Sequence, residues 1–110
     1  KEEVVLLCHL CQEMERMMLE KQIEKKLIKA IKELGGIAPK FVSPGFDGMP
    51  DRLVLFPGGK LAFVEVKAPG KKPRDLQAAR HKLLRDLGFT VYVLDDMQQI
   101  GGFLDEIRTT

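Results

Sequence analysis

Apolar side chains recur at helical spacing in the first third of the chain. Between residues 20 and 34, four of them lie three or four positions apart: Ile23, Leu27, Ile31 and Leu34. This period predicts an amphipathic helix with one apolar face. Gly35-Gly36 is expected to end it, because glycine is common just past a helix C-terminus. A weaker stripe of the same period predicts a preceding helix over residues 3 to 18.

Shorter apolar segments in the middle of the chain predict strands. Ala38 to Val42 is expected to be a short strand, and residues 43 to 50 a loop, because glycines and prolines interrupt it. Arg52 to Phe56 and Lys60 to Lys67 are expected to pair as a hairpin across Pro57-Gly58-Gly59. Successive side chains of a strand point to opposite sides. In the second strand, one face therefore carries Ala62, Val64 and Val66, and the other carries Leu61, Phe63, Glu65 and Lys67.

The C-terminal half predicts a strand–helix–strand unit. A helix is expected from Pro73 to Leu87, and a buried strand from Phe89 to Leu94. Because a helix joins this strand to the hairpin, a parallel, right-handed crossover follows. A last helix is expected from Met97 to Ile107, interrupted at Gly101-Gly102. The fold class is thus α/β, a mixed β-sheet flanked by helices. The predicted face of the first of these helices holds Leu76, Leu83, Leu84 and Leu87, with Arg80 at its edge.

The composition fits one soluble domain. The chain has 110 residues, of which 45% are hydrophobic and 31% charged, so a packed core is expected rather than disorder. No segment approaches the roughly 18 consecutive apolar residues of a membrane span. The first residues lack the basic start and long apolar run of a signal peptide. We therefore expect an intracellular protein.

Positive charge gathers in one segment. Residues 67 to 85 carry a net charge of +6, although the whole chain carries only +2. Such a cluster can attract phosphates, which makes its basic residues candidates for DNA contacts. For a charge run taken alone, a solvated helix face is the better interpretation. Beyond Lys67, the basic residues of this segment are Lys71, Lys72, Arg74, Arg80, Lys82 and Arg85.

The two cysteines do not make a metal site by themselves. Cys8 and Cys11 have the C-x-x-C spacing of half a zinc site, with His9 between them. Structural zinc needs four ligands, and His81 is the only other histidine. We interpret both cysteines as apolar helix residues in a reducing compartment.

The chemistry-bearing residues fall at the outer ends of the predicted hairpin. Asp51 begins its first strand, and Glu65 and Lys67 end its second. Asp51, Glu65 and the carbonyl of Val66 are the oxygen ligands that Mg²⁺ prefers, and Lys67 would orient a water or stabilise charge on a phosphate. These parts suit phosphodiester hydrolysis. On spacing alone, an ordinary turn and a half-exposed strand remain the better interpretation.

The same residues resemble a known family. Asp51 followed by Glu65-x-Lys67 resembles the PD-(D/E)XK nuclease superfamily, and more closely its VRR-NUC branch. The resemblance covers about residues 20 to 95. The wider match consists of Gly35-Gly36, Lys40-Phe41, Ser43-Pro44-Gly45, Gly48-Met49-Pro50-Asp51-Arg52, Pro57-Gly58-Gly59, Phe63-Val64-Glu65-Val66-Lys67, Gln77, Leu84 and Gly88.

The resemblance implies a restriction-endonuclease-like core and assigns roles to residues. Residues 19–110 would form the VRR-NUC-like nuclease domain, and residues 1–18 an N-terminal helical extension. The family's cofactor is Mg²⁺ or Mn²⁺. Asp51, Glu65 and Glu24 are implied metal ligands, Lys67 the catalytic lysine, and Gln77 a residue that steadies the site or the phosphate.

Small members of this family resemble phage or bacterial proteins that act as homodimers on four-way DNA junctions. The resemblance therefore implies a structure-selective DNA endonuclease, with Holliday-junction resolution as the favoured activity, in the cytoplasm of a bacterium or phage-infected cell. Three alternatives stay open. They are a nuclease of flaps, single strands or linear duplex, a DNA-binding module that does not cut, and a protein that acts on RNA.

Overall fold

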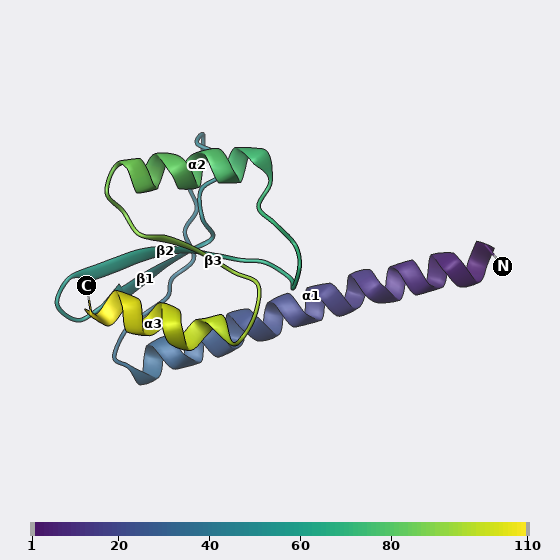
Figure 1. The fold of residues 1–110 in the computed structure, drawn as a ribbon, viewed down its shortest axis with the longest axis horizontal. Coiled ribbons are helices and arrows are strands. Elements are labelled where there is room, and N and C mark those ends of the chain that lie inside the picture. Colours follow the sequence, from purple (N-terminus) through teal and green to yellow (C-terminus); the bar gives the residue numbers. More distant parts are fainter. Residues whose placement is uncertain (1, 110) are drawn as a thin grey trace.

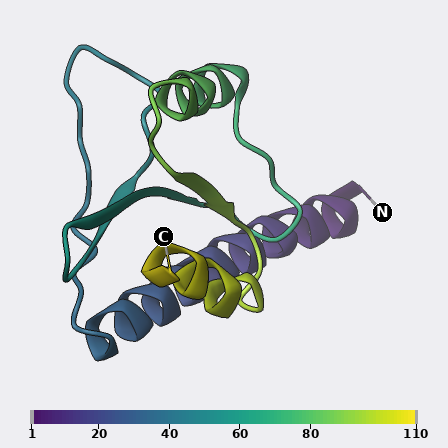
Figure 2. The ribbon, with the colours of Figure 1, turned by 60° about the vertical axis from the view of Figure 1, so that its left-hand side comes forward.

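The computed structural model describes residues 2–109, and the side chains of residues 9–109. Three layers make up the fold (Figure 1). A small sheet lies in the middle, one helix covers one face, and two helices cover the other, an arrangement that Figure 2 shows from a second direction. The elements are α1 (Glu2–Glu33), β1 (Arg52–Phe56), β2 (Lys60–Val66), α2 (Asp75–Asp86), β3 (Val91–Leu94) and α3 (Gln99–Thr109).

The sheet is mixed, as predicted. Its strand order is β1-β2-β3. The hairpin strands β1 and β2 are antiparallel, with Arg52 opposite Val64, and β2 and β3 are parallel, with Phe63 opposite Val91. The helix α2 connects the two parallel strands. The predicted α/β class, the hairpin and the parallel crossover are therefore all confirmed.

The predicted strand at Ala38 to Val42 is wrong. This segment lies beside β1 but makes only isolated bridges, between Ile37 and Leu55 and between Lys40 and Arg52. Pro39 lies between the two bridges and has no N–H to donate, so a continuous ladder is interrupted there.

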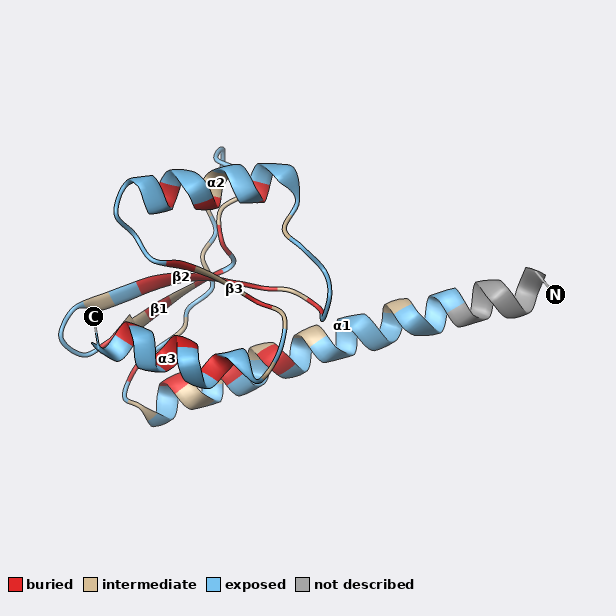
Figure 3. Cartoon of the chain, in the orientation of Figure 1, coloured by how far each residue is buried: buried red, intermediate tan, exposed pale blue. Residues whose placement is uncertain are grey.

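The first helix is continuous, whereas the sequence predicted two. No glycine or proline occurs between residues 2 and 33, so no residue of this stretch interrupts the helix. Among its described side chains, those that pack on the core lie in its C-terminal half: Ile23, Leu27 and Ile31. Residues 9 to 19 project past the sheet and are almost wholly exposed, including Cys11 (Figure 3). The side chain of Cys8 is not among those that the structure describes.

The last helix also runs without a break. Gly101-Gly102 lies inside α3, where the sequence predicted an interruption. Both glycines are exposed, and the neighbouring Ile100 and Phe103 are buried against the sheet. Burial of the apolar face stabilises this helix and outweighs a glycine cost of about 1 kcal/mol per residue.

Two cores lie on opposite faces of the sheet. The larger joins α1 and α3 to the side chains of Val54, Ala62 and Val64. The smaller joins Leu84 of α2 to Phe63 of β2 and Val91 of β3. Within residues 2–109, no helix is long and apolar enough to cross a membrane.

The buried face of α2 agrees with the predicted one only at Leu84. Leu76, Leu83 and Leu87 are exposed, and α2 turns Gln77, His81 and Leu84 toward the sheet. The reason is the surface beneath the helix, because the face of β2 that α2 covers carries a carboxyl group as well as Phe63. Polar side chains of α2 face that carboxyl group.

Candidate active site

Two acids meet at the open end of the hairpin. Arg52 is paired with Val64, so Asp51 and Glu65 are the next residues along their two chains. Opposed residues of antiparallel strands share a face. Asp51 is exposed to solvent, and Glu65 is only 1% exposed. The fold therefore brings together the acids that the sequence placed at this corner.

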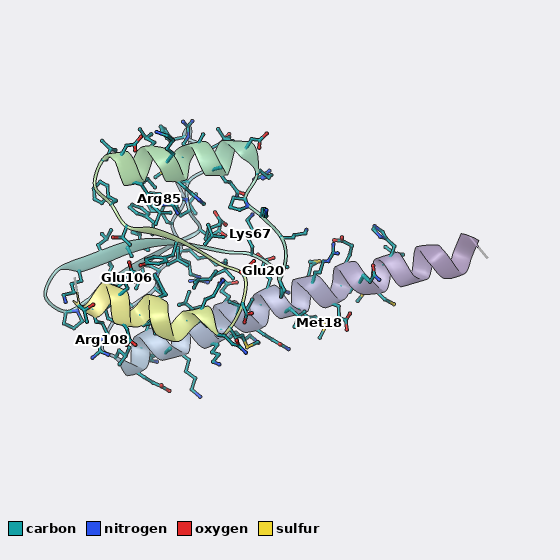
Figure 4. The ribbon with its side chains drawn as sticks, in the orientation of Figure 1. Met18, Glu20, Lys67, Arg85, Glu106 and Arg108 are labelled. Carbon is teal, nitrogen blue, oxygen red and sulfur yellow. The ribbon has the colours of Figure 1, made fainter. Side chains whose placement is uncertain are left out.

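Lys67 completes the corner. It follows Glu65 by two positions and so points to the same face of the sheet. Its backbone N–H donates to the carbonyl of Leu94 at 2.8 Å, which fixes it at the carboxyl end of the parallel pair β2 and β3. Figure 4 shows it there, half-buried at the end of β2. In α/β folds, ligands commonly bind at this edge of a sheet.

The environment of Glu65 favours its neutral form. Burial raises the pKa of Glu65 to about 8, and Asp51 contributes to the rise through a hydrogen bond and its negative charge. The positive charge of Lys67 acts in the opposite direction. Glu65 therefore holds a proton at neutral pH, and a bound cation would have to displace it.

Helix α2 supplies the side chains around Glu65. Gln77 accepts a hydrogen bond from the backbone N–H of Arg74 at 2.9 Å, which turns its amide nitrogen toward the sheet. That nitrogen donates to Oε1 of Glu65 at 3.4 Å. One turn later, Nε2 of His81 lies 3.8 Å from the same oxygen. Burial lowers the pKa of His81, and the positive charge of Arg85 adds to this.

The two acids of helix α1 have different surroundings. Glu24 forms an ion pair with the guanidinium of Arg52, which also donates to the carbonyl of Ala38 at 2.7 Å. Glu20 lies one turn earlier, and its negative charge raises the pKa of Glu65. Figure 4 shows Glu20 beneath the end of β2, near Lys67. Of the two, Glu20 is the acid that acts on the Asp51–Glu65 pair.

A divalent cation fits the donors at this corner. Asp51 and Glu65 offer carboxylate oxygens and Val66 a backbone carbonyl, and Mg²⁺ takes such oxygens while keeping several waters. The raised pKa of Glu65 supports this fit: burial and the charge of Asp51 disfavour its ionised form, and a cation between the two acids would offset their repulsion. Among the described residues, no three His, Cys, Asp or Glu side chains form a ready-made metal cluster.

The predicted DNA-binding residues divide into two groups. Lys71, Lys72 and Arg74 are exposed on the segment that climbs from β2 to α2. The other three, Arg80, Lys82 and Arg85, have hydrogen-bond partners within the chain. Arg80 donates to the carbonyl of Asp47 at 2.9 Å and stacks 3.9 Å over Phe46, Lys82 donates to Asp86 at 2.7 Å, and Arg85 donates to the carbonyl of Val91 at 2.9 Å.

Known proteins share both the sequence and the fold. A protein of Acyrthosiphon pisum secondary endosymbiont phage 1, described as a candidate nuclease p44, is 54% identical over 93 residues, which cover 84% of this chain and 99% of that protein. A solved structure described as a VRR_NUC domain is 31% identical with a TM-score of 0.73, covering 78% of this chain and 94% of that one. The chain belongs to the VRR-NUC family of nucleases. No protein-family model matches the sequence.

Two residues beside this candidate site were not singled out from the sequence. Glu20 lies three positions before Ile23 and so continues the buried helical stripe toward the N-terminus, where an acid marks a polar end of the core face. His81 follows Gln77 by four positions and shares its face of α2. Both signals are present in the sequence, but each gains meaning only once Glu65 is known to lie opposite.

Proposed function

We propose that this VRR-NUC protein is a metal-dependent DNA endonuclease, with Holliday junctions as its favoured substrate. The observation that supports it most is the buried carboxyl of Glu65, which lies next to Asp51 and on the same face of the sheet as Lys67. A structural ion pair explains this arrangement poorly, because two acids in contact destabilise a fold unless a proton or a cation lies between them.

Each side chain has a role in phosphodiester hydrolysis under this proposal. Asp51, Glu65 and the carbonyl of Val66 hold Mg²⁺ or Mn²⁺, and Glu20 adds negative charge close by. The bound ion would polarise the scissile phosphate and lower the pKa of a water. Lys67 orients that water or stabilises the negative charge that develops on the phosphate.

The residue Glu24, which the family resemblance also implied as a ligand, has a different role in this proposal. Its carboxylate pairs with Arg52, so it joins α1 to the start of β1. It thereby holds Asp51, the next residue, at the corner. Gln77 steadies Glu65 through the contact described above.

A panel of labelled DNAs tests activity and substrate together. Four-way junctions, flaps, single strands, linear duplex and matched RNAs would be incubated with Mg²⁺ or Mn²⁺. We expect symmetric cuts in the junction, and no cutting by Lys67→Ala or Asp51→Asn although both variants bind DNA. Persistent cleavage by either purified variant would place the chemistry elsewhere. Preferred cutting of another substrate would correct the target, and binding without cutting would indicate a non-catalytic module.

We further propose that the protein works as a homodimer in the bacterial or phage-infected cytoplasm. A two-fold junction presents two equivalent strands, so two copies related by two-fold symmetry would cut it symmetrically. Sedimentation equilibrium with and without junction DNA measures the number of copies. A monomer that stays single on the junction would contradict this part of the proposal.

A further inference from the structure

A buried histidine nitrogen lies next to the candidate metal ligand. His81 is 2% exposed, and its Nε2 is buried without a hydrogen-bond partner. It lies 3.8 Å from Oε1 of Glu65, slightly too far for a hydrogen bond. A buried N–H or lone pair without a partner costs about 1–3 kcal/mol, so its persistence needs an explanation.

Its neighbour on α2 has the same target. Gln77 donates to Oε1 of Glu65 at 3.4 Å, a long contact, and its amide is held in this direction by the backbone N–H of Arg74. Two nitrogens from successive turns of one helix thus converge on one carboxyl oxygen. The bond from Gln77 is long, and Nε2 of His81 lies just outside hydrogen-bonding distance.

A charged carboxylate would satisfy both. When a cation binds at Glu65, this carboxyl must be ionised, and a buried carboxylate accepts hydrogen bonds that are shorter and stronger than those of a neutral acid. A contraction of about 1 Å would bring Nε2 of His81 to a hydrogen-bonding distance of about 2.8 Å. Outer-sphere donors of this kind orient metal ligands and raise metal affinity.

We propose that His81 is a positioning residue for the metal ligand Glu65. With its proton on Nε2, the imidazole donates to the inner oxygen of Glu65 together with Gln77 and leaves the outer oxygen for the cation. This inference rests on the proposed function, since it concerns the same site. It adds a residue, an atom and a tautomer to that site.

Cation binding without DNA tests the role apart from cutting. Mn²⁺ binding would be measured by the loss of its free-ion electron paramagnetic resonance signal. We expect His81→Leu to weaken binding about 10- to 100-fold, as the loss of an outer-sphere partner commonly does. We expect His81→Gln to retain most of the affinity, because its amide nitrogen reaches the position of Nε2.

A matched control separates positioning from packing. Leu84→Val shortens the next buried residue of α2 and should lower the unfolding temperature without changing Mn²⁺ affinity. Equal affinity of His81→Leu and wild type would overturn the inference. So would an equal loss in the Leu and Gln variants, or in Leu84→Val. If wild type itself binds no Mn²⁺, the proposed function fails and this inference with it.

The histidine ring gives a second, direct readout. Nitrogen-15 correlation spectra of the two imidazole rings would be recorded while Mg²⁺ is added. We expect His81 to carry its proton on Nε2 and its Nε2 resonance to shift, while His9, which is exposed on the projecting part of α1, stays unchanged. A proton on Nδ1 of His81 in the Mg²⁺-bound protein would overturn the proposal.

Discussion

At the scale of single residues, Glu65 decides how this site depends on pH. Its side chain is buried beside Asp51, and that position is costly for a charged group but suits a protonated one. Local sequence did not indicate this, since Glu65 occurs in an ordinary alternating strand. The cost arises from α2, which covers the strand and removes water from it.

The raised pKa of Glu65 has a definite effect on stability without metal. The ordinary pKa of a glutamate is 4.5, and that of Glu65 in the folded state is about 8. Between pH 4.5 and about pH 8, the folded state therefore binds more protons than the unfolded state. The contribution of Glu65 to stability is therefore complete below pH 4.5 and is lost as the pH rises through 8. We predict that Glu65→Gln removes this loss.

Urea unfolding in a chelator at several pH values measures the effect. The difference between wild type and Glu65→Gln isolates Glu65, because the lowered pKa of His81 acts in the opposite direction. The variant should gain stability relative to wild type as the pH rises from 5 toward 8. A difference that does not change with pH would show that Glu65 is ionised throughout.

The two acids of α1 should separate in experiment. Glu24→Gln breaks the pair with Arg52, whose guanidinium is largely buried, and should cost about 1–2 kcal/mol, less than a fully buried pair because Glu24 is partly exposed. Glu20→Gln should leave stability nearly unchanged and weaken Mn²⁺ binding. Thermal unfolding and Mn²⁺ titration of both variants check this. Weaker Mn²⁺ binding in Glu24→Gln, with a loss of stability in Glu20→Gln, would instead indicate Glu24 as the metal ligand.

At the scale of elements, the loop before β1 positions Asp51 by packing on α2. Gly48 has a φ of +88°, and a Cβ there would lie 2.8 Å from Cγ of Leu76 and 3.1 Å from Cγ of Arg80. The guanidinium of Arg80 holds the same loop through Asp47 and Phe46. Arg80 therefore stabilises the contact between this loop and α2.

We predict that Gly48→Ala lowers both stability and activity. The added methyl group meets α2 in a backbone conformation that alanine disfavours, so the loss should reach about 2–4 kcal/mol. Gly45→Ala is the matched control. Gly45 has a φ of +79°, but a Cβ there has no neighbour within 4 Å, so only the conformational cost of about 1–2 kcal/mol applies.

Denaturant unfolding and junction cleavage of the two variants compare these effects. Activity should fall more in Gly48→Ala than in Gly45→Ala, because only the first displaces the loop that leads to Asp51. Equal losses in both variants would show that the contact with α2 does not position the site.

The sequence pattern predicted the elements and their pairing better than it predicted which face of α2 is buried. The hairpin and crossover followed from alternation and turn residues. The buried face of α2 did not, because counting leucines assumed an apolar surface beneath the helix. Leu76 lies on the loop side instead, and Gln77 and His81 face Glu65.

At the scale of the whole molecule, positive charge concentrates between β2 and α2. Lys71, Lys72 and Arg74 are exposed on this connection, close in sequence to Lys67. The intramolecular partners of Arg80, Lys82 and Arg85 leave the connecting segment as the stronger candidate for phosphate contacts.

We predict that DNA affinity falls steeply with salt and that this segment is responsible for much of the fall. In an Asp51→Asn background, which would bind without cutting, Lys71→Ala with Lys72→Ala should reduce the slope of log K against log salt by about 2. Lys29→Ala, on an exposed site of α1 across the sheet, is the control and should leave the slope unchanged. An affinity independent of salt would exclude the phosphate-contact proposal.

The sequence by itself determined the strand pairing, the crossover and the corner where Asp51, Glu65 and Lys67 meet, because alternation and turn residues act between near neighbours in the chain. Only the tertiary structure decided that Glu65 is buried with a raised pKa, that Glu20 acts on it while Glu24 pairs with Arg52, and that His81 faces it. Burial and charge coupling depend on segments far apart in sequence. They exist only after α1 and α2 have closed on the two faces of the sheet.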